Sequence, residues 1–142
     1  MTFGNLEFIL DFTMAMQKTT TPDFQVTAKV VYVESESRPE EGYYFFAYKI
    51  SIKNVGHSTA QLMSRHWEIT DADGKKEDVR GPGVVGLQPK IQPGQTFEYD
   101  SACPLNTSTG SMKGRYHFVA EGGESFTVEV PEFYLIAPTA LH

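Results

Sequence analysis

Apolar and polar residues alternate along most of this chain, and that period of two restricts it to β-strands. Residues 24–32 and 44–52 each place a row of apolar side chains on one face. The rows are Phe24, Val26, Ala28, Val30 and Tyr32, and then Tyr44, Phe46, Tyr48, Ile50 and Ile52. Because successive strand side chains point to opposite faces, such rows are typical of half-buried strands. No stretch shows a sustained apolar period of 3.6 residues, which argues against amphipathic helices.

Turn residues divide the rest of the chain into further short strands. A third strand is predicted over 60–70, with Met63, Trp67 and Ile69 in one row, before a tight turn at Asp71–Gly74. Many short strands with frequent turns predict an all-β fold, a two-sheet sandwich of immunoglobulin or fibronectin type III shape in a single domain. A closed barrel is the alternative.

Length, charge and cysteine content set further limits. At 142 residues the chain can bury one core without disulfide or metal support. Its net charge of −6 argues against nucleic-acid and anionic-membrane binding, because both need a positive surface. Cys103 is the single cysteine, so no intramolecular disulfide can form and a reducing compartment is expected.

The first residues are partly apolar but match neither a secretory signal nor a membrane span. The first basic residue is Lys18, and the apolar run is far shorter than the roughly 20 residues of a span. We therefore expect a soluble, cytoplasmic protein with an N-terminal extension over 1–21 and a domain over 22–142. The extension either packs against the domain or is translated sequence upstream of a start at Met14 or Met16.

The segment Gly81–Gly86 has the pattern G-x-G-x-x-G. In a dinucleotide-binding fold this pattern opens a helix, but Pro89 and Pro93 follow too closely for one. One interpretation is that the glycines allow positive φ in a loop packed across the sandwich. The other is an anion site formed by backbone N–H groups and nearby cations. The residues of that site would be Gly81, Gly83 and Gly86, assisted by Lys75, Lys76, Arg80 and Lys90.

Arg65 lies in the predicted third strand, where it shares a face with Trp67. If Trp67 is in the core, Arg65 is part-buried and bonded to a carboxylate or to loop carbonyls. An arginine held in this way is pre-organised to bind phosphate or carboxylate. A second hypothesis is therefore that Arg65 and Arg80 together line an anion site.

The remaining residues indicate neither a metal site nor a catalytic site. His57, His66 and His117 are scattered, without an H-E-x-x-H motif or a cysteine pair. Cys103 lacks any signal for a lowered pKa and is expected to be a buried or inert thiol. The chain has no G-x-S-x-G elbow and no Walker-type phosphate loop. We predict no catalytic residues, no metal ligands and no cofactor.

Several segments together resemble the ApaG family, which is also called CorD. These segments are Ser64–Asp71, Val79–Pro89, Pro93–Tyr99, Ser101–Leu105, Met112–Gly114 and Ala137–His142. The resemblance covers residues 22–142 and implies an immunoglobulin or fibronectin type III-like sandwich. The family's glycine motif falls on Gly81, Gly83 and Gly86, and the family has no established catalytic residues.

The resemblance also implies a type of function. The family occurs as small bacterial proteins, and related domains are fused to F-box proteins and to a DNA-polymerase-delta-interacting protein. Those settings are typical of protein-interaction modules. The bacterial names come from gene neighbourhood with a diadenosine tetraphosphate hydrolase and from a link to cobalt and magnesium efflux.

The leading hypothesis is a non-enzymatic binding module that contacts a protein partner through one sheet face and the Arg80–Pro93 loop. Tyr43 and Phe45 are expected to be exposed contacts, unless they pack under the N-terminal extension. One alternative is a small-ligand sensor that binds polyphosphate or a dinucleotide through Arg65, Arg80 and the glycine segment. Another is a divalent-metal binder, and an exposed edge strand would allow a homodimer.

Overall fold

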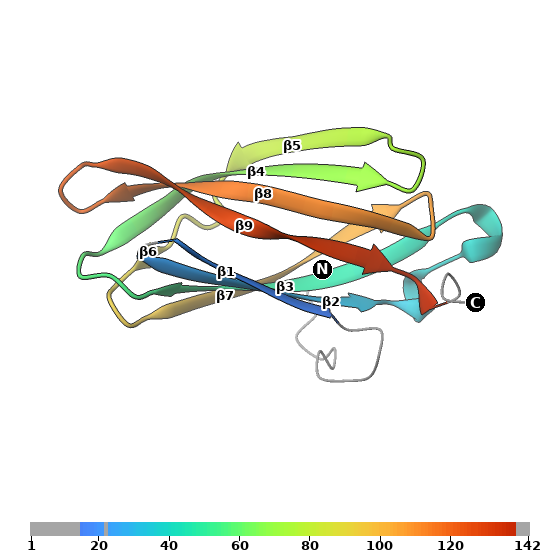
Figure 1. Ribbon diagram of the computed structural model, residues 1–142, viewed down its shortest axis with the longest axis horizontal. Coiled ribbons are helices and arrows are strands. Elements are labelled where there is room, and N and C mark those ends of the chain that lie inside the picture. The colour runs from blue at the N-terminus through green and yellow to red at the C-terminus, as the bar shows by residue number, and fades with distance from the viewer. Residues whose placement is uncertain (1–14, 22, 139–142) are drawn as a thin grey trace.

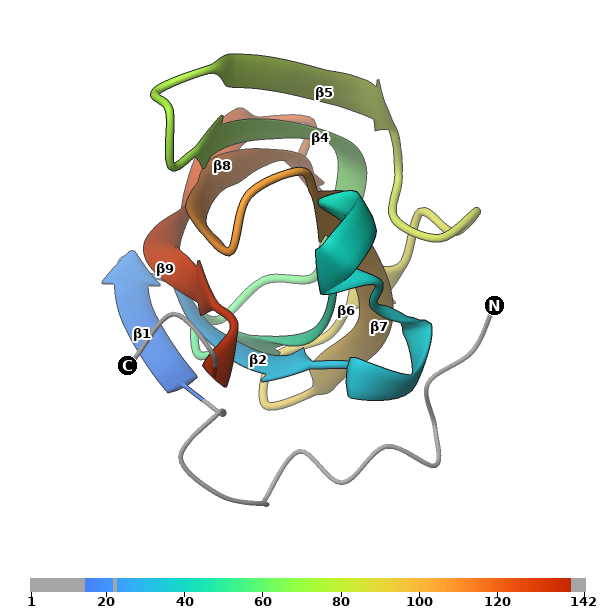
Figure 2. The same cartoon turned by 90° about the vertical axis from the view of Figure 1, so that its right-hand side faces the viewer.

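The protein folds into two antiparallel β-sheets that pack face to face (Figure 1, Figure 2). The structure is a computed structural model that describes residues 15–21 and 23–138, with side chains from residue 23 onward. Because the described strands form two separate sheets, the predicted all-β sandwich is confirmed and the closed barrel is excluded. Within the described residues, no helix is long and apolar enough to cross a membrane.

Each sheet has a simple strand order. The first sheet runs β1-β2-β3-β7, with bounds β1 (Ala15–Thr21), β2 (Phe24–Tyr32), β3 (Tyr44–Asn54) and β7 (Thr96–Leu105). The second sheet runs β5-β4-β8-β9, and β6 also pairs with β4. Its bounds are β4 (Ala60–Asp71), β5 (Lys76–Pro82), β6 (Lys90–Ile91), β8 (Thr109–Ala120) and β9 (Ser125–Ile136). Two short 3-10 helices, η1 (Glu34–Glu36) and η2 (Pro39–Glu41), connect β2 to β3.

The inner faces of the two sheets form one core. Trp67 of β4 is only 3% exposed and stands edge-on to three other rings. Its ring centroid lies 5.8 Å from that of Tyr48, 6.2 Å from that of Tyr116 and 5.8 Å from that of Phe133. Edge-to-face pairs of this kind stabilise a core beyond the area that they bury.

A β-bulge in β4 changes which side chains face the core, and it removes Met63 from the inward row predicted for that strand. The pairing of β4 with β8 shifts register between Leu62 and Ser64, so Met63 is the extra residue. Leu62 is fully buried, whereas Met63 is only partly buried. Beyond the bulge, Arg65 lies opposite Tyr116 and Trp67 opposite Gly114, both on the inner face of β8.

The outer face of the first sheet differs from the expectation at one end. Phe45 is 9% exposed and Ala47 is fully buried, so the prediction that Phe45 is an exposed contact is wrong. The connection after β2 folds back over these residues, because Val33 donates its N–H to Phe45. Ser37 fixes the fold-back, since its Oγ accepts from Phe45 N at 2.9 Å and donates to Val33 O at 2.8 Å. Tyr43, in contrast, is 37% exposed.

The first described strand falls within the segment predicted as the N-terminal extension. β1 lies inside the range predicted as an extension, 1–21, yet it pairs with β2 from Ala15 opposite Val30 to Thr21 opposite Phe24. The hydrogen-bonded sheet therefore includes residues from both sides of the predicted boundary. Residues 1–14 lie outside the described residues, and the interpretations of that segment stay predictions.

Candidate functional site

The glycine segment forms a tight hairpin turn rather than a helix start. Val84 and Leu87 exchange both backbone hydrogen bonds, at 2.8 and 2.9 Å. The two residues between them have positive φ, 42° at Val85 and 81° at Gly86. Positive φ at both central positions defines a type I′ turn. We call residues 84–87 the loop tip.

Gly83 adopts a conformation and a position that exclude a side chain. Its φ is +59°, and a Cβ there would lie 2.2 Å from the carbonyl oxygen of Leu87. The N–H of Gly83 donates to Met63 O at 2.8 Å, and the Gln88 side chain donates to the same oxygen at 2.9 Å. The bulge at Met63 thus supplies the carbonyl that fastens both arms of the loop to β4.

Arg65 holds the same loop from the inner side of the sheet. Its Nη1 donates to the carbonyl oxygens of Pro82 and Gly83, at 3.1 and 3.0 Å. A Cβ on Gly81 would lie 3.0 Å from that nitrogen, so Gly81 leaves the space that the guanidinium occupies. Arg65 is part-buried, as expected, and of its two expected partners, a carboxylate or loop carbonyls, the structure shows the loop carbonyls.

The cationic side chains predicted to form an anion site do not converge, although Arg65 lies beside Gly81 and Gly83. Arg80 lies opposite His66 in the β4–β5 ladder and Arg65 opposite Gly81, so the two arginines project from opposite faces. Lys76 pairs with Thr70 and Lys90 with Gln61, near opposite ends of β4. Carbonyl oxygens, not N–H groups, face Arg65.

Several backbone N–H groups of the loop already donate hydrogen bonds within the protein. The N–H groups of Gly83, Val84 and Leu87 all donate to backbone carbonyls. An anion nest needs such groups to be available. Anion binding by Gly81, Gly83 and Gly86 therefore stays a prediction, and the hydrogen bonding of the loop gives it little support.

The loop tip presents apolar side chains to solvent. Val85 is 55% exposed and Leu87 is 53% exposed, while Val84 between β5 and the turn is fully buried. The sequence reasoning missed this feature, because two adjacent valines favour extended backbone.

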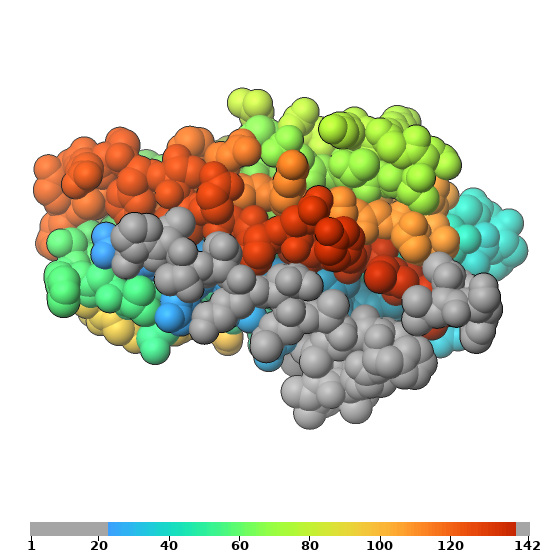
Figure 3. Space-filling view, viewed as in Figure 1, coloured from blue at the N-terminus to red at the C-terminus, as the bar shows by residue number. Residues whose placement is uncertain are grey.

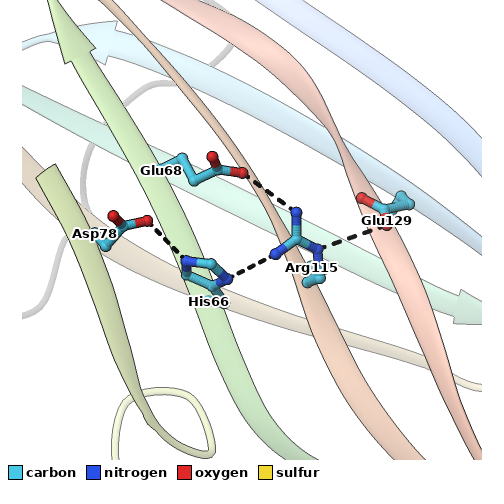
Figure 4. A network of polar contacts seen from close by, with 5 residues as sticks. All are labelled: His66, Glu68, Asp78, Arg115 and Glu129. Carbon is cyan, nitrogen blue, oxygen red and sulfur yellow. Dashed lines mark hydrogen bonds and ion pairs between the residues drawn. The ribbon is translucent and has the colours of Figure 1, made fainter. Parts of the chain in front are cut away.

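A network of charged side chains covers the outer face of the second sheet (Figure 4). Arg115 donates to Nδ1 of His66 at 2.6 Å, and His66 Nε2 lies 2.9 Å from Asp78. Arginine only donates, so Nδ1 is the acceptor and Nε2 carries the proton given to Asp78. Arg115 also meets Glu68 at 3.2 Å and Glu129 at 3.7 Å. The hydrogen bond from His66 holds the pKa of the exposed Asp78 carboxyl below its usual value.

The tyrosine hydroxyl groups and the thiol that are buried between the sheets stay neutral at pH 7. Burial raises the pKa of Tyr48 to about 12, and it raises the pKa of Tyr99 and of Tyr116 well above the ordinary value. The hydroxyl groups of Tyr99 and Tyr116 are hydrogen-bonded to each other. Burial likewise raises the pKa of the Cys103 thiol to about 12. Of the expectation of a buried or inert thiol, the burial is confirmed.

The three histidines singled out in the sequence occupy different environments. His66 belongs to the charged network, His117 approaches Thr127 Oγ1 at 3.4 Å, and His57 lies on the β3–β4 connection. Among the described residues, no group of three His, Cys, Asp or Glu side chains is placed to hold a metal ion.

The chain is similar to proteins of one named family. A family model described as the ApaG domain matches residues 34–120. A protein named Protein ApaG from Bdellovibrio bacteriovorus is 83% identical over 127 residues, 89% of this chain and 100% of that relative. One from Acidithiobacillus ferrooxidans is 46% identical over 127 residues, with the same coverage. These names state no reaction.

Two solved structures share the fold over most of the chain. One is a crystal structure described as an ApaA protein from Bordetella pertussis, with 48% identity and a TM-score of 0.80. The match covers 82% of this chain and 94% of that chain. The other is an X-ray structure from a structural genomics consortium, with 43% identity and a TM-score of 0.79 over 84% of this chain and 91% of that chain.

Proposed function

This chain belongs to the ApaG family, and we propose that it is a non-enzymatic binding module that contacts a protein partner through the loop tip. The observation that carries the proposal is the exposure of Val85 and Leu87 on a loop that hydrogen bonds to Met63 and Arg65 fasten to β4. Because the loop is already ordered, little conformational entropy is lost when the two side chains are buried by a partner. Burial of a Val or Leu side chain against a partner is favourable, because apolar surface is removed from water.

The backbone of Val85 adds a second argument. A β-branched residue rarely adopts positive φ, and the strained conformation costs about 1–2 kcal/mol. Val85 keeps φ at 42° although Gly or Asn would fit the turn without that cost. Strain retained at one exposed residue supports a role for its apolar side chain outside the folded domain.

The hydrogen bonding of His66 and the burial of Cys103 support the non-enzymatic part of the proposal. Both ring nitrogens of His66 are engaged, by Arg115 and by Asp78, so the ring is not available as a general base. The Cys103 thiol is buried and protonated, which removes it as a nucleophile. The phosphate-sensor alternative draws less support, because Arg65 and Arg80 lie on opposite faces of the sheet.

Affinity capture with matched variants tests the proposal. Leu87→Asp places a charge at the loop tip, and Ile136→Asp places one at another exposed apolar position, on β9. We expect at least one protein that the parent and Ile136→Asp capture equally, and that Leu87→Asp captures at least about tenfold less. Mass spectrometry at equal bait provides the comparison. Identical sets of captured proteins for all three baits would contradict the proposal.

A further inference from the structure

One end of the sandwich contains a hollow that the loop tip does not reach. It has a volume of about 450 Å³ and lies between the β3–β4 connection and the turn that joins β8 to β9. Figure 3 shows these two segments side by side at one end of the molecule. The volume falls in the range that small-molecule sites occupy, roughly 300–1,000 Å³.

The floor of the hollow is aromatic. Phe24 and Phe126 line it, with ring centroids 5.7 Å apart, and Phe126 stacks on Phe118 at 5.5 Å. Ala60 and Ala120 complete the apolar part of the lining. Phe126 is partly exposed and is the accessible ring of this floor, whereas Phe24 is 1% exposed and supports it from within the core. An exposed ring of this kind can hold an apolar or aromatic group and attracts a nearby cation.

The walls are fixed by backbone and side-chain hydrogen bonds. The fully buried side chain of Asn54 donates to Ser58 O at 2.8 Å and to Ile91 O at 2.9 Å, and accepts from Gly56 N at 2.9 Å. These three bonds set the path of the connection that carries His57 and Ser58. Glu121 N donates to Thr59 O at 2.9 Å, and this bond joins the turn between β8 and β9 to the β3–β4 connection.

The rim carries negative charge. Asp23 and Glu124 are the two charged residues among those that line the hollow. None of the three ion pairs within the described part of the chain involves either of them. The Asp23 side chain lies close to Gly56, where an added Cβ would come within 2.8 Å of it. Ser58 and Thr127 add hydroxyl groups to the lining.

From this combination we propose that the end hollow binds a small organic ammonium ion. The apolar or aromatic body of the ligand lies against the exposed part of Phe126, and its ammonium group is neutralised by the rim carboxylates of Asp23 and Glu124. A free amine and the lysine side chain of a protein partner share this chemistry. The inference uses a different surface from the loop tip and does not depend on the proposed function.

A titration followed by amide NMR of the full chain tests the inference. The probe is phenethylammonium, and two controls of the same size are 2-phenylethanol, which is neutral, and phenylacetate, which is an anion. Nα-acetyl-lysine amide tests the side-chain source. We expect saturable shifts for phenethylammonium at His57, Ser58, Glu124 and Thr127, and at least about fivefold weaker binding of both controls.

Isosteric variants separate charge recognition from non-specific contact. Asp23→Asn and Glu124→Gln should each weaken phenethylammonium binding about two- to fivefold, since solvent-exposed ion pairs contribute modestly. The control variant Glu40→Gln lies in η2, and Figure 1 shows that cyan segment at the opposite end of the molecule from the turn between β8 and β9, so binding should be unchanged. Equal binding of the three probes, the absence of localised shifts at millimolar concentration, or no response to the two rim variants would overturn the inference.

Discussion

Val85 occupies a backbone region that β-branched residues avoid, and its side chain is more than half exposed. Its neighbours are each placed for an evident reason: Val84 is buried, Gly86 has φ of 81°, and Gly83 leaves room for the Leu87 carbonyl. Val85 is the residue of the loop tip whose type the fold does not require. The effect of Val85 on stability can therefore be measured separately from its effect on binding.

The substitution Val85→Asn should raise stability. Asn tolerates positive φ, and an Asn–Gly pair is favoured in type I′ turns, so the strain of about 1 kcal/mol is relieved. For a domain of this size we expect the melting temperature to rise by about 3–5 °C in a calorimetric scan. A lower melting temperature would contradict the interpretation that Val85 is strained.

The substitution Gly83→Ala should lower stability by about 2 kcal/mol or more. A Cβ at that position combines positive φ with a 2.2 Å approach to the Leu87 carbonyl. Gly86→Ala is the matched control, because Gly86 also has positive φ but its Cβ would meet nothing within 4 Å. We expect the control to lose only about 1 kcal/mol in urea denaturation. Equal losses would show that the close approach is unimportant.

At the scale of single elements, strands with a clean alternation could be predicted and irregular ones could not. β2 and the start of β3 follow from the apolar rows of the sequence, and β2 has the predicted bounds. The bulge at Met63 carries no sequence signal, because the strand continues on both sides of it. β9 continues past Pro131 to Ile136 through a second register shift, which accommodates a residue without a backbone N–H.

β1 illustrates how pairing can decide where a domain starts. Its sequence, Ala15–Thr21, has weak alternation and lies in the range predicted as an extension, yet every position from Ala15 to Thr21 pairs with β2. Without β1, the backbone groups on one edge of β2 would be exposed, and exposed edges promote association.

Two truncations test the contribution of β1. Removing residues 1–21 deletes the strand and should lower stability by at least about 2 kcal/mol, because edge hydrogen bonds are lost. The same truncation should shift the protein toward dimers in size-exclusion chromatography. Removing residues 1–14 leaves β1 intact and should produce much smaller effects. Equal behaviour of the two truncations would contradict a structural role for β1.

At the scale of the whole molecule, the buried tyrosine hydroxyl groups make the stability of the fold depend on pH. Tyr48, Tyr99 and Tyr116 meet between the two sheets, and burial raises the pKa of each. The unfolded chain would ionise them near pH 10. The stabilisation is therefore fully present below pH 10 and is lost as the pH rises toward the folded values, which for Tyr48 is about 12.

Alkaline titration followed at 295 nm should therefore show tyrosines that ionise only as the protein unfolds. Of the seven tyrosines in the chain, Tyr48, Tyr99 and Tyr116 should ionise only together with loss of near-ultraviolet circular dichroism. Ionisation of these three tyrosines near pH 10 without unfolding would contradict their burial.

How far the sequence predicts the candidate site depends on which interactions are local. The contact of Arg65 with loop carbonyls was predicted, because alternation places Arg65 beside Trp67 on the inner face. The separation of Arg65 from Arg80 depends on the β4–β5 register, and the burial of Phe45 depends on a connection that folds back. Neither follows from spacing along the chain. The exposed loop tip was not predicted, since Val85 adopts a conformation against its own preference.

The most direct test of a partner at the loop tip is site-specific photo-crosslinking in cells. Benzoylphenylalanine replaces Leu87 in one protein and Ile136 in another, both of which are exposed apolar positions. A discrete crosslinked product from position 87, absent from position 136, is the predicted result. Equal products from both positions, or none from position 87, would contradict a docking role for the loop tip.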